Sequence, residues 1–157
     1  MHLIIYIIIF FSRHEPFSIS AIFANNNFIP VSYSCSGANV NPELRIKGIP
    51  QNTKTLALVM EDPDPAFGTF DHWVMWNIPP QNKIAEDSAP GIVGTNSRKQ
   101  NKYTGPCPPS GVHHYHFKIY ALNTSLNLSD TSGKRTLMAA MKGHILAEAE
   151  LVGLFNK

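Results

Sequence analysis

Residues 55–78 read TLALVMEDPDPAFGTFDHWVMWNI, two apolar segments joined by a loop rich in aspartate and proline. The segments 55–62 and 71–78 are rich in β-branched or aromatic residues and prolines follow both, so we expect two buried strands. The prolines of the loop fix the backbone φ angle and remove N–H donors, so the chain leaves the first strand along a stiff path. That path would hold the carboxylates of Asp62 and Asp64 in place.

Further strand patterns lie on both sides of this stretch. Ser18 to Phe23 alternates polar and apolar residues, as a half-buried strand does, and His114 to Leu122 is a strong strand candidate. Between the strands, Gly91 to Pro109 is interrupted by glycines and prolines, which predicts a long irregular segment. Long loops in compact domains are often where binding occurs.

Helix is expected only near the end of the chain. Lys134 to Lys142 follows Ser132-Gly133 and is expected to place three apolar residues on one face, namely Leu137, Met138 and Met141. His144 to Leu151 is expected to form a second short helix. Many strands followed by short helices predict a mainly β protein, an antiparallel β-sandwich with peripheral and C-terminal helices. No linker separates two cores, so residues 15–157 are expected to form one domain.

Composition excludes several classes of protein. The 157-residue chain is 43% hydrophobic and 15% charged, with twelve prolines and ten glycines, which is typical of a loop-rich globular protein. Its formal charge of +2 comes with scattered basic residues and no cluster larger than a pair such as Arg98-Lys99, so no nucleic-acid partner is expected. No cofactor is expected either, and a homodimer is left open.

The N-terminus and the cysteines do not decide in which cellular compartment the protein resides. Leu3 to Phe11 reads LIIYIIIFF, too short to span a bilayer as a helix but long enough for the apolar region of a signal peptide. Because the usual basic residues do not precede it, an uncleaved anchor, a poor export signal and an artefact of start-codon choice are alternatives, and residues 1–14 are set apart from the fold. Cys35 and Cys107 can pair in an oxidising compartment. The localisation is therefore left unknown: cytoplasmic, or periplasmic or membrane-anchored if the segment is a real signal.

Strict alternation along the strands places a polar residue at the end of each of three apolar rows. The rows are Leu56, Leu58 and Met60 for Asp62; Val74, Trp76 and Ile78 for His72; and Tyr115, Phe117 and Ile119 for His113. The three polar residues are either separate caps or one convergent pocket at the mouth of the sandwich. A carboxylate bonded to an imidazole favours a charged, doubly donating histidine, which is a good receptor for phosphate or carboxylate.

Simpler interpretations exist for each of these residues. An Asp-Pro-Asp-Pro sequence is most often a turn in which Asp caps its own backbone, and His72 alone is more often a satisfied buried histidine than a ligand. His114 and His116 share the opposite face with Lys118, where solvated polar residues are the default. Alternation separates His113 from them, and no zinc motif supports a metal site. Cys107 has no obvious base, which argues against a nucleophile.

The motifs together resemble one known family. The quoted sequences are Asp62-Pro63-Asp64, Phe70-Asp71-His72-Trp73-Val74, and Tyr103-Thr104-Gly105-Pro106-Cys107-Pro108-Pro109-Ser110-Gly111 followed by His113 and Tyr115. In this order and spacing they resemble the phosphatidylethanolamine-binding protein family, and most closely its bacterial and archaeal Raf-kinase-inhibitor-like branch. The resemblance covers about residues 17–155.

The resemblance implies a Greek-key β-sandwich with a small anion-binding pocket at one end. Carried over by position, the residues that would line the pocket are Asp62, Asp64, His72, Cys107, Pro109, His113 and Tyr115. Members of the family bind phosphate-bearing head groups or similar anions and modulate kinases, proteases or developmental complexes without a general catalytic activity. The chain departs from the family pattern at Pro65-Ala66, where the usual order of the pair is inverted, and at His114, where a titratable side chain replaces an arginine.

Three functions follow, in order of preference. The first is a non-enzymatic protein that binds a phosphate or phospholipid-head-group-like anion and modulates a partner, for example a kinase or protease. The second is an inhibitor that acts through its protein surface and does not use the pocket for a ligand. The third is a hydrolase with His72 or His113 as base and Asp62 as its orienting carboxylate, which lacks a positioned nucleophile.

Overall fold

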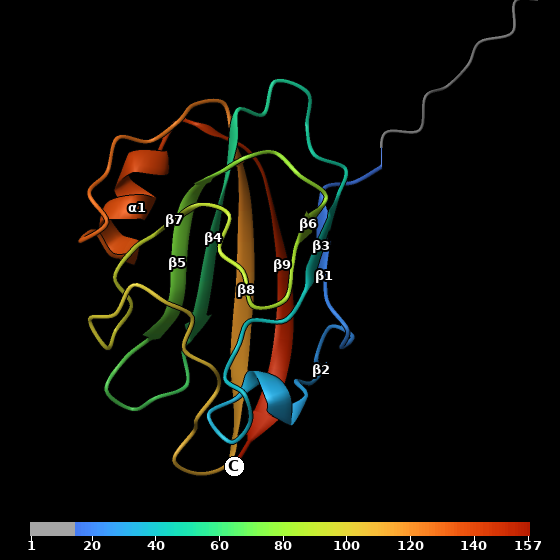
Figure 1. Ribbon diagram of the computed structural model, residues 1–157, viewed down its shortest axis with the longest axis vertical. Coiled ribbons are helices and arrows are strands. Elements are labelled where there is room, and N and C mark those ends of the chain that lie inside the picture. The colour runs from blue at the N-terminus through green and yellow to red at the C-terminus, as the bar shows by residue number, and fades with distance from the viewer. Residues whose placement is uncertain (1–14) are drawn as a thin grey trace, which may run out of the picture.

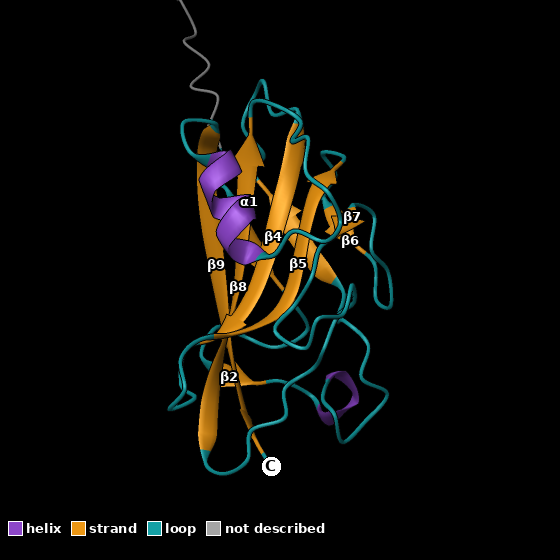
Figure 2. Ribbon diagram, turned by 90° about the vertical axis from the view of Figure 1, so that its left-hand side faces the viewer, coloured by secondary structure: helices purple, strands orange, loops and turns teal. Residues whose placement is uncertain are grey.

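The computed structural model describes residues 15–157, which form two β-sheets packed face to face with a single α-helix outside them (Figures 1 and 2). The smaller sheet has the strand order β1-β3-β6, and the larger has the order β2-β9-β8-β4-β5-β7. The strands of the smaller sheet are β1 (Ser18–Ser20), β3 (Leu44–Lys47) and β6 (Lys83–Ile84). Those of the larger sheet are β2 (Asn27–Phe28), β4 (Thr55–Asp62), β5 (Phe70–Ile78), β7 (Ile92–Val93), β8 (Val112–Leu122) and β9 (Ile145–Asn156).

The predicted mainly β, Greek-key sandwich is confirmed. After the β4–β5 hairpin the chain passes through the other sheet and returns along a long connection to place β8 beside β4, as a Greek key requires. All pairings are antiparallel except that of β2 with β9. The residues predicted for the two central strands and for β8 agree with the structure, whereas β1 ends at Ser20, short of the predicted Phe23.

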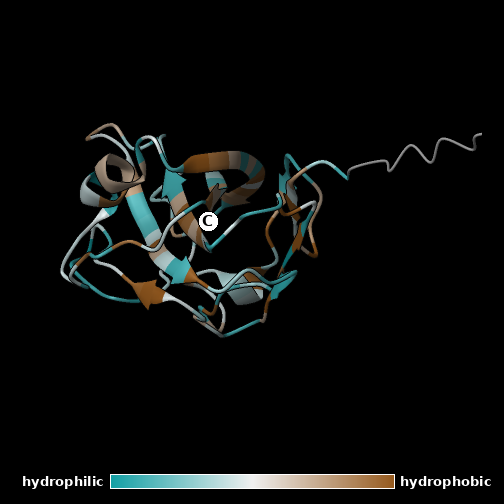
Figure 3. Cartoon of the chain, turned by 90° about the horizontal axis from the view of Figure 1, so that it is seen from above, coloured by the Kyte–Doolittle hydropathy of each residue, from teal (hydrophilic) through white to brown (hydrophobic). Residues whose placement is uncertain are grey.

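Two hydrophobic cores lie on the two faces of the larger sheet. The first fills the space between the sheets and includes the fully buried side chains of Met60, Trp73 and Phe117. The second lies under α1 (Lys134–Met141) and includes Trp76. In the view from above, brown hydrophobic colouring lies mostly on the strands and the helix, while much of the connecting chain is teal or white (Figure 3).

The second predicted helix, His144 to Leu151, is wrong, because these residues begin β9. This segment pairs antiparallel with β8 along its whole length. Its side chains alternate, with Ala147 and Ala149 packed against the core between the sheets and Glu148 exposed. The local helix preference of these residues is outweighed by their alternating apolar pattern and by pairing with a long neighbouring strand. Met138 was also misplaced, since it is 39% exposed while Leu137 and Met141 are buried.

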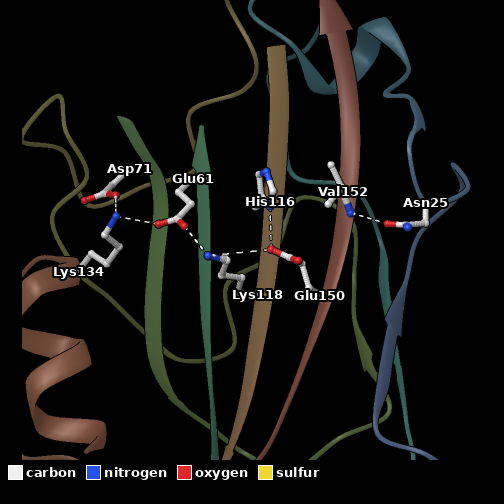
Figure 4. A network of polar contacts seen from close by, with 8 residues as sticks. All are labelled: Asn25, Glu61, Asp71, His116, Lys118, Lys134, Glu150 and Val152. Carbon is white, nitrogen blue, oxygen red and sulfur yellow. Dashed lines mark hydrogen bonds and ion pairs between the residues drawn. The ribbon is translucent and has the colours of Figure 1, made fainter. Parts of the chain in front are cut away.

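A charged network fastens α1 to the outer face of the larger sheet (Figure 4). The carboxylate of Glu61 accepts hydrogen bonds from Lys118 at 2.6 Å and from Lys134 of α1 at 2.7 Å, and Lys134 also lies 2.7 Å from the carboxylate of Asp71. Burial alone would raise the pKa of Glu61, but the two ammonium groups hold it below its usual range. His116 continues the network through Glu150, on the face opposite His113, as the alternation predicted.

Candidate functional site

The sequence-predicted polar residues meet at one end of the sandwich, where β4 ends and β5 and β8 begin, at the lower end of Figure 1. A cavity of about 170 Å³ opens there. Its lining consists of Asp62, Pro65, Phe67, Phe70, His72, Arg98, Cys107, Pro108, Pro109, His113 and Tyr115. Six of the seven predicted site residues therefore share one cavity. The seventh, Asp64, is not part of the lining.

Asp62 and His113 form a buried pair in this cavity. The Nδ1 of His113 lies 2.7 Å from Oδ2 of Asp62, and their side chains are only 11% and 4% exposed. The other carboxylate oxygen of Asp62 accepts the backbone N–H of Asp64 at 2.9 Å, so the loop after β4 folds back onto its own strand end. A carboxylate can only accept, so His113 donates from Nδ1 and leaves its Nε2 for another partner.

His72 is oriented by the backbone of the loop after β7. Its Nδ1 donates to the carbonyl oxygen of Thr104 at 2.6 Å, and the backbone N–H of Thr104 donates back to the carbonyl of His72. Burial lowers the pKa of His72, so the ring is held in its neutral form with Nδ1 protonated. Its Nε2 makes no hydrogen bond within residues 15–157 and carries a lone pair.

His72 reaches the cavity through a β-bulge. Strict alternation predicted that His72 shares a face with Val74 and Trp76, but these two residues pack in the core under α1. The register between β4 and β5 shifts after the pair Met60–Trp73, so that Glu61 opposes Asp71 and His72 is the extra residue. The predicted row is therefore wrong, although the predicted meeting of His72 with Asp62 and His113 is seen.

Tyr115 forms the back of the cavity. Its side chain is fully buried, and its ring meets that of His72 edge to face at 5.2 Å between centroids. Burial and the charge of Asp62 raise the pKa of Tyr115, partly offset by the nearby backbone N–H of Cys107, so it is a neutral donor. Within the described chain its hydroxyl hydrogen has no acceptor.

Asp64 lies outside the cavity because it pairs with His114. Its Oδ2 accepts both the backbone N–H of His114 at 2.7 Å and the ring Nδ1 at 2.8 Å. Burial opposes ionisation of Asp64, but these bonds hold its pKa below the usual range. His114, which stands where the family pattern has an arginine, thus holds a carboxylate of the loop after β4.

The cysteines form a disulfide that borders the cavity. Cys35 and Cys107 are bonded to each other. The sequence alone had left open whether they pair. The backbone N–H of Cys35 also donates to the carbonyl oxygen of Pro106. The wall of the cavity is thereby tied to the segment after η1 (Val31–Tyr33). Since Cys107 has no free thiol, it is not a nucleophile in this state.

Donor atoms of Asp62, Asp64 and His113 lie within 4.8 Å of one another, close enough to consider a metal ion. The carboxylates already accept hydrogen bonds from a backbone N–H or from a histidine ring, and Nδ1 of His113 is committed to Asp62. These hydrogen bonds account for the grouping without an ion, so we assign no metal here.

Five cavity residues were not named as site residues by the sequence analysis, namely Arg98 and the apolar group Pro65, Phe67, Phe70 and Pro108. Phe67 is 82% exposed at the tip of the loop after β4, and Arg98 belongs to the irregular segment before β8. The signal that could have indicated Phe67 is its place in a loop, after two prolines and before a glycine, where a large apolar side chain is seldom buried. From the sequence, the pair Arg98-Lys99 was considered only in relation to a basic cluster that could bind nucleic acid.

Known proteins share this fold and these motifs. Residues 19–156 match the profile of the phosphatidylethanolamine-binding protein family. The chain belongs to this family. A UPF0098 protein of Pyrococcus horikoshii is 45% identical over 150 residues, covering 88% of this chain and 76% of the relative. A UPF0098 protein of Methanothermobacter thermautotrophicus is 41% identical over 143 residues, covering 86% of this chain and 95% of the relative.

Solved structures give the same family. A crystal structure of a phosphatidylethanolamine-binding protein (PEBP) homolog of Chlamydia trachomatis has a TM-score of 0.87 and 35% identity, covering 90% of this chain and 97% of that one. An Escherichia coli member of the mammalian PEBP family has a TM-score of 0.82 and 25% identity, covering 90% and 98%. These relatives are archaeal and bacterial, as the motifs of the PEBP chain predicted.

The apolar segment Leu3 to Phe11 and the boundary proposed at residue 14 lie outside the described residues. Among residues 15–157, no helix has the length and apolar character needed to cross a membrane.

Proposed function

We propose that this PEBP-family protein binds a small phosphate-bearing anion, such as a phospholipid head group or a free phosphate ester, without catalysing its conversion. The observation that carries the proposal is the state of the two cavity histidines. Each ring commits Nδ1 to the protein, His72 to the Thr104 carbonyl and His113 to Asp62, and each leaves Nε2 without a partner in the described chain. Two fixed rings with uncommitted nitrogens in one cavity are a prepared polar receptor.

The polar groups match the chemistry of a phosphate. When His113 is protonated, its Nε2–H donates toward the cavity while Nδ1–H remains bonded to Asp62, and the charge of the carboxylate is balanced. Neutral His72 offers an acceptor that suits a protonated phosphate oxygen or an ammonium group of the ligand. Phe67, Phe70 and the cavity prolines give the opposite wall an apolar surface, which suits the carbon atoms of an ester.

The composition of the cavity supports a binding role over catalysis. Its lining within the described chain contains no serine or threonine, and the sulfur of Cys107 is in a disulfide. The histidines therefore have no serine or threonine hydroxyl and no thiol to activate as a nucleophile, and the hydroxyl of Tyr115 belongs to a phenol whose pKa is raised. Turnover of a chromogenic phosphate ester that disappears in Asp62→Asn would overturn this part of the proposal and favour the hydrolase.

A partner function through the surface is the second candidate, because the mouth of the cavity carries exposed apolar side chains. Phe67 of the lining is 82% exposed, and Val112, which precedes the lining residue His113 at the start of β8, is 46% exposed. A kinase or protease would contact this rim, and the complex would depend on Phe67. Pull-down of a partner that survives His113→Ala but not Phe67→Ser would favour this inhibitor function over ligand binding.

A thermal-shift titration of the full-length protein tests the anion proposal. Sulfate, phosphate and phosphoethanolamine are added at pH 6 and pH 8 to the wild type and to His113→Ala. A ligand of the folded state raises the unfolding temperature with its concentration. We expect stabilisation that is larger at pH 6 and absent in the variant. Sulfate keeps the same charge at both pH values, so it separates protonation of the protein from that of the ligand. No shift at millimolar concentrations of any of the three would contradict the proposal.

A further inference from the structure

Arg98 is a cation at the cavity that has no partner within the described chain. Its side chain is exposed and lines the cavity, and its guanidinium makes no ion pair or side-chain hydrogen bond with residues 15–157. Some exposed basic residues, such as Arg45 and Lys47, have carboxylate partners at 3.0 Å and 3.2 Å. Others, such as Lys99 and Arg135, have none within residues 15–157, but they do not line the cavity as Arg98 does. An arginine without a partner at a cavity mouth is available for a ligand.

The backbone at Arg98 is held in place by a buried asparagine. The side-chain oxygen of Asn96, which is 2% exposed, accepts the backbone N–H of Arg98 at 2.9 Å and that of Gln100 at 3.1 Å. Its amide nitrogen donates to Oγ1 of Thr104 at 3.0 Å. Since the carbonyl of Thr104 orients His72, one hydrogen-bonded unit positions both the arginine and the histidine.

Two further contacts tie this turn to β5. The backbone N–H of Ser97 donates to the carbonyl of Asp71 at 2.9 Å, and the backbone N–H of Asp71 donates to the hydroxyl of Ser97 at 2.8 Å. The turn also requires Lys99 to adopt a φ of 59°, an uncommon conformation for a residue other than glycine or asparagine. The chain thus builds a specific turn that ends beside the cavity.

The charge of Arg98 acts inside the cavity. After burial, which is the largest cause, the positive charge of Arg98 contributes to the lowered pKa of His72. Arg98 is also the only lysine or arginine in the lining that the structure describes. When His113 is protonated, its charge cancels that of Asp62. The surplus positive charge that an anion meets is then that of Arg98.

The exposure of the lining residues indicates the side through which an ester substituent of a bound phosphate would leave the cavity. Asp62, His72 and Tyr115 are buried at its inner end, with exposed fractions of 3%, 5% and 0%. Arg98 and Phe67 are exposed, so they mark the open side. A phosphate with one ester substituent can therefore direct that substituent out of the open side and keep its other oxygens within reach of the buried histidines and of Arg98, whereas a second substituent would meet the closed end or displace an oxygen from Arg98.

We propose that Arg98 is the residue that binds the ligand charge, and that it makes this pocket prefer terminal phosphate monoesters to phosphate diesters. The inference rests on the proposed anion-binding function and names the ligand class. A monoester carries between one and two negative charges near pH 7, and a diester carries one. The planar guanidinium can hold two oxygens of the monoester at once.

Isothermal titration calorimetry of the full-length protein at pH 7 tests the inference with phosphoethanolamine, a monoester, and glycerophosphoethanolamine, a diester with the same head group. Arg98→Gln is expected to weaken monoester binding at least about tenfold, the loss typical of a charge-assisted hydrogen bond. The diester should lose at most about twofold. Lys99→Gln removes the same charge one residue away, outside the lining, and should change neither by more than about twofold.

The outcomes separate this inference from the proposed function. Tight monoester binding that is lost in His113→Ala but unchanged in Arg98→Gln would overturn the role of Arg98 and leave the anion site standing. Equal losses for both ligands, or equal effects of Arg98→Gln and Lys99→Gln, would reduce Arg98 to a general electrostatic contribution and overturn the selectivity. Wild-type protein that binds neither ligand would overturn both proposals.

Discussion

Replacing Asp62 by asparagine should reduce the pH dependence of anion binding while weakening the fold. In the wild type, Oδ2 of Asp62 accepts from Nδ1 of His113 at 2.7 Å and Oδ1 accepts from the backbone N–H of Asp64 at 2.9 Å. An asparagine at this position can keep the second bond through its oxygen. Its amide nitrogen then faces Nδ1 of His113 and can only donate, so the imidazole must change tautomer and carry its hydrogen on Nε2.

The change of tautomer has a functional consequence that the wild type lacks. Neutral wild-type His113 presents a lone pair from Nε2 to the cavity, and only the protonated ring presents an N–H. In Asp62→Asn the neutral ring already presents an N–H, and the negative charge that repels an anion is gone. We therefore expect the fall in sulfate affinity between pH 6 and pH 8 to be less steep in the variant than in the wild type.

The loss of stability can be estimated from the same two bonds. Hydrogen bonds to a charged group contribute about 1.5–3 kcal/mol each and neutral ones about 0.5–1.5 kcal/mol. Both side chains of the pair are nearly buried, at 4% and 11% exposure, so solvent screens little of this difference. Neutralising the carboxylate should thus lower the free energy of unfolding by about 1–3 kcal/mol. The measurement is urea unfolding followed by fluorescence of the buried Trp73 and Trp76.

Asp64→Asn is the matched control for this experiment. Its pair with His114 is half-exposed, so the change in stability should be below about 1 kcal/mol and the pH profile of binding should match the wild type. Persistence of the wild-type pH dependence in Asp62→Asn would refute the tautomer reasoning. Reduced pH dependence in the control instead would place its origin in the pair of Asp64 and His114.

Three further perturbations have expected outcomes. Tyr115→Phe removes a buried hydroxyl whose hydrogen has no acceptor in the described chain, so we expect unchanged or higher stability in urea unfolding, whereas Tyr103→Phe, whose hydroxyl donates to a backbone carbonyl at 2.7 Å, should lose about 1 kcal/mol. Replacing Cys35 and Cys107 by serine opens a loop with a sequence separation of 72 residues, and the chain-entropy relation gives a loss of about 4 kcal/mol in the same assay. Burial lowers the pKa of His72 below its ordinary 6.5. The stability that neutral His72 contributes is therefore complete above pH 6.5 and is lost as the pH falls through the folded-state pKa. In His72→Gln the free energy of unfolding should decline less from pH 6.5 downward than in the wild type.

Much of the fold could be predicted because its strands carry strong local signals. The segments 55–62 and 71–78 are apolar and end at prolines, and the structure places β4 and β5 there with at most one residue of difference. The segment 145–151 was misassigned because alanine, leucine and glutamate favour helix locally. What decides its structure is pairing with β8, a non-local interaction that composition does not reveal.

The site shows a similar division between local and non-local information. Asp62, His72 and His113 could be named because each stands where an apolar strand meets a polar loop. Arg98 could not, since its position depends on the turn around Asn96 and on that turn's contacts with Asp71. Contacts of this kind join residues far apart in the sequence, and no periodic pattern announces them.

The β-bulge at His72 is the step that turns three strand ends into one cavity. Without the extra residue, alternation would place His72 on the same face as Val74, in the core under α1, since Val74 packs there. The shift of register between Met60 and Glu61 places His72 on the face of Asp62 and Tyr115, and it places Asp71 on the other face, beside Lys134. One irregularity therefore supplies the cavity with an imidazole and the helix with its anchoring carboxylate. Bulges of this kind are common beside functional sites, where they aim a side chain that a regular strand would direct elsewhere.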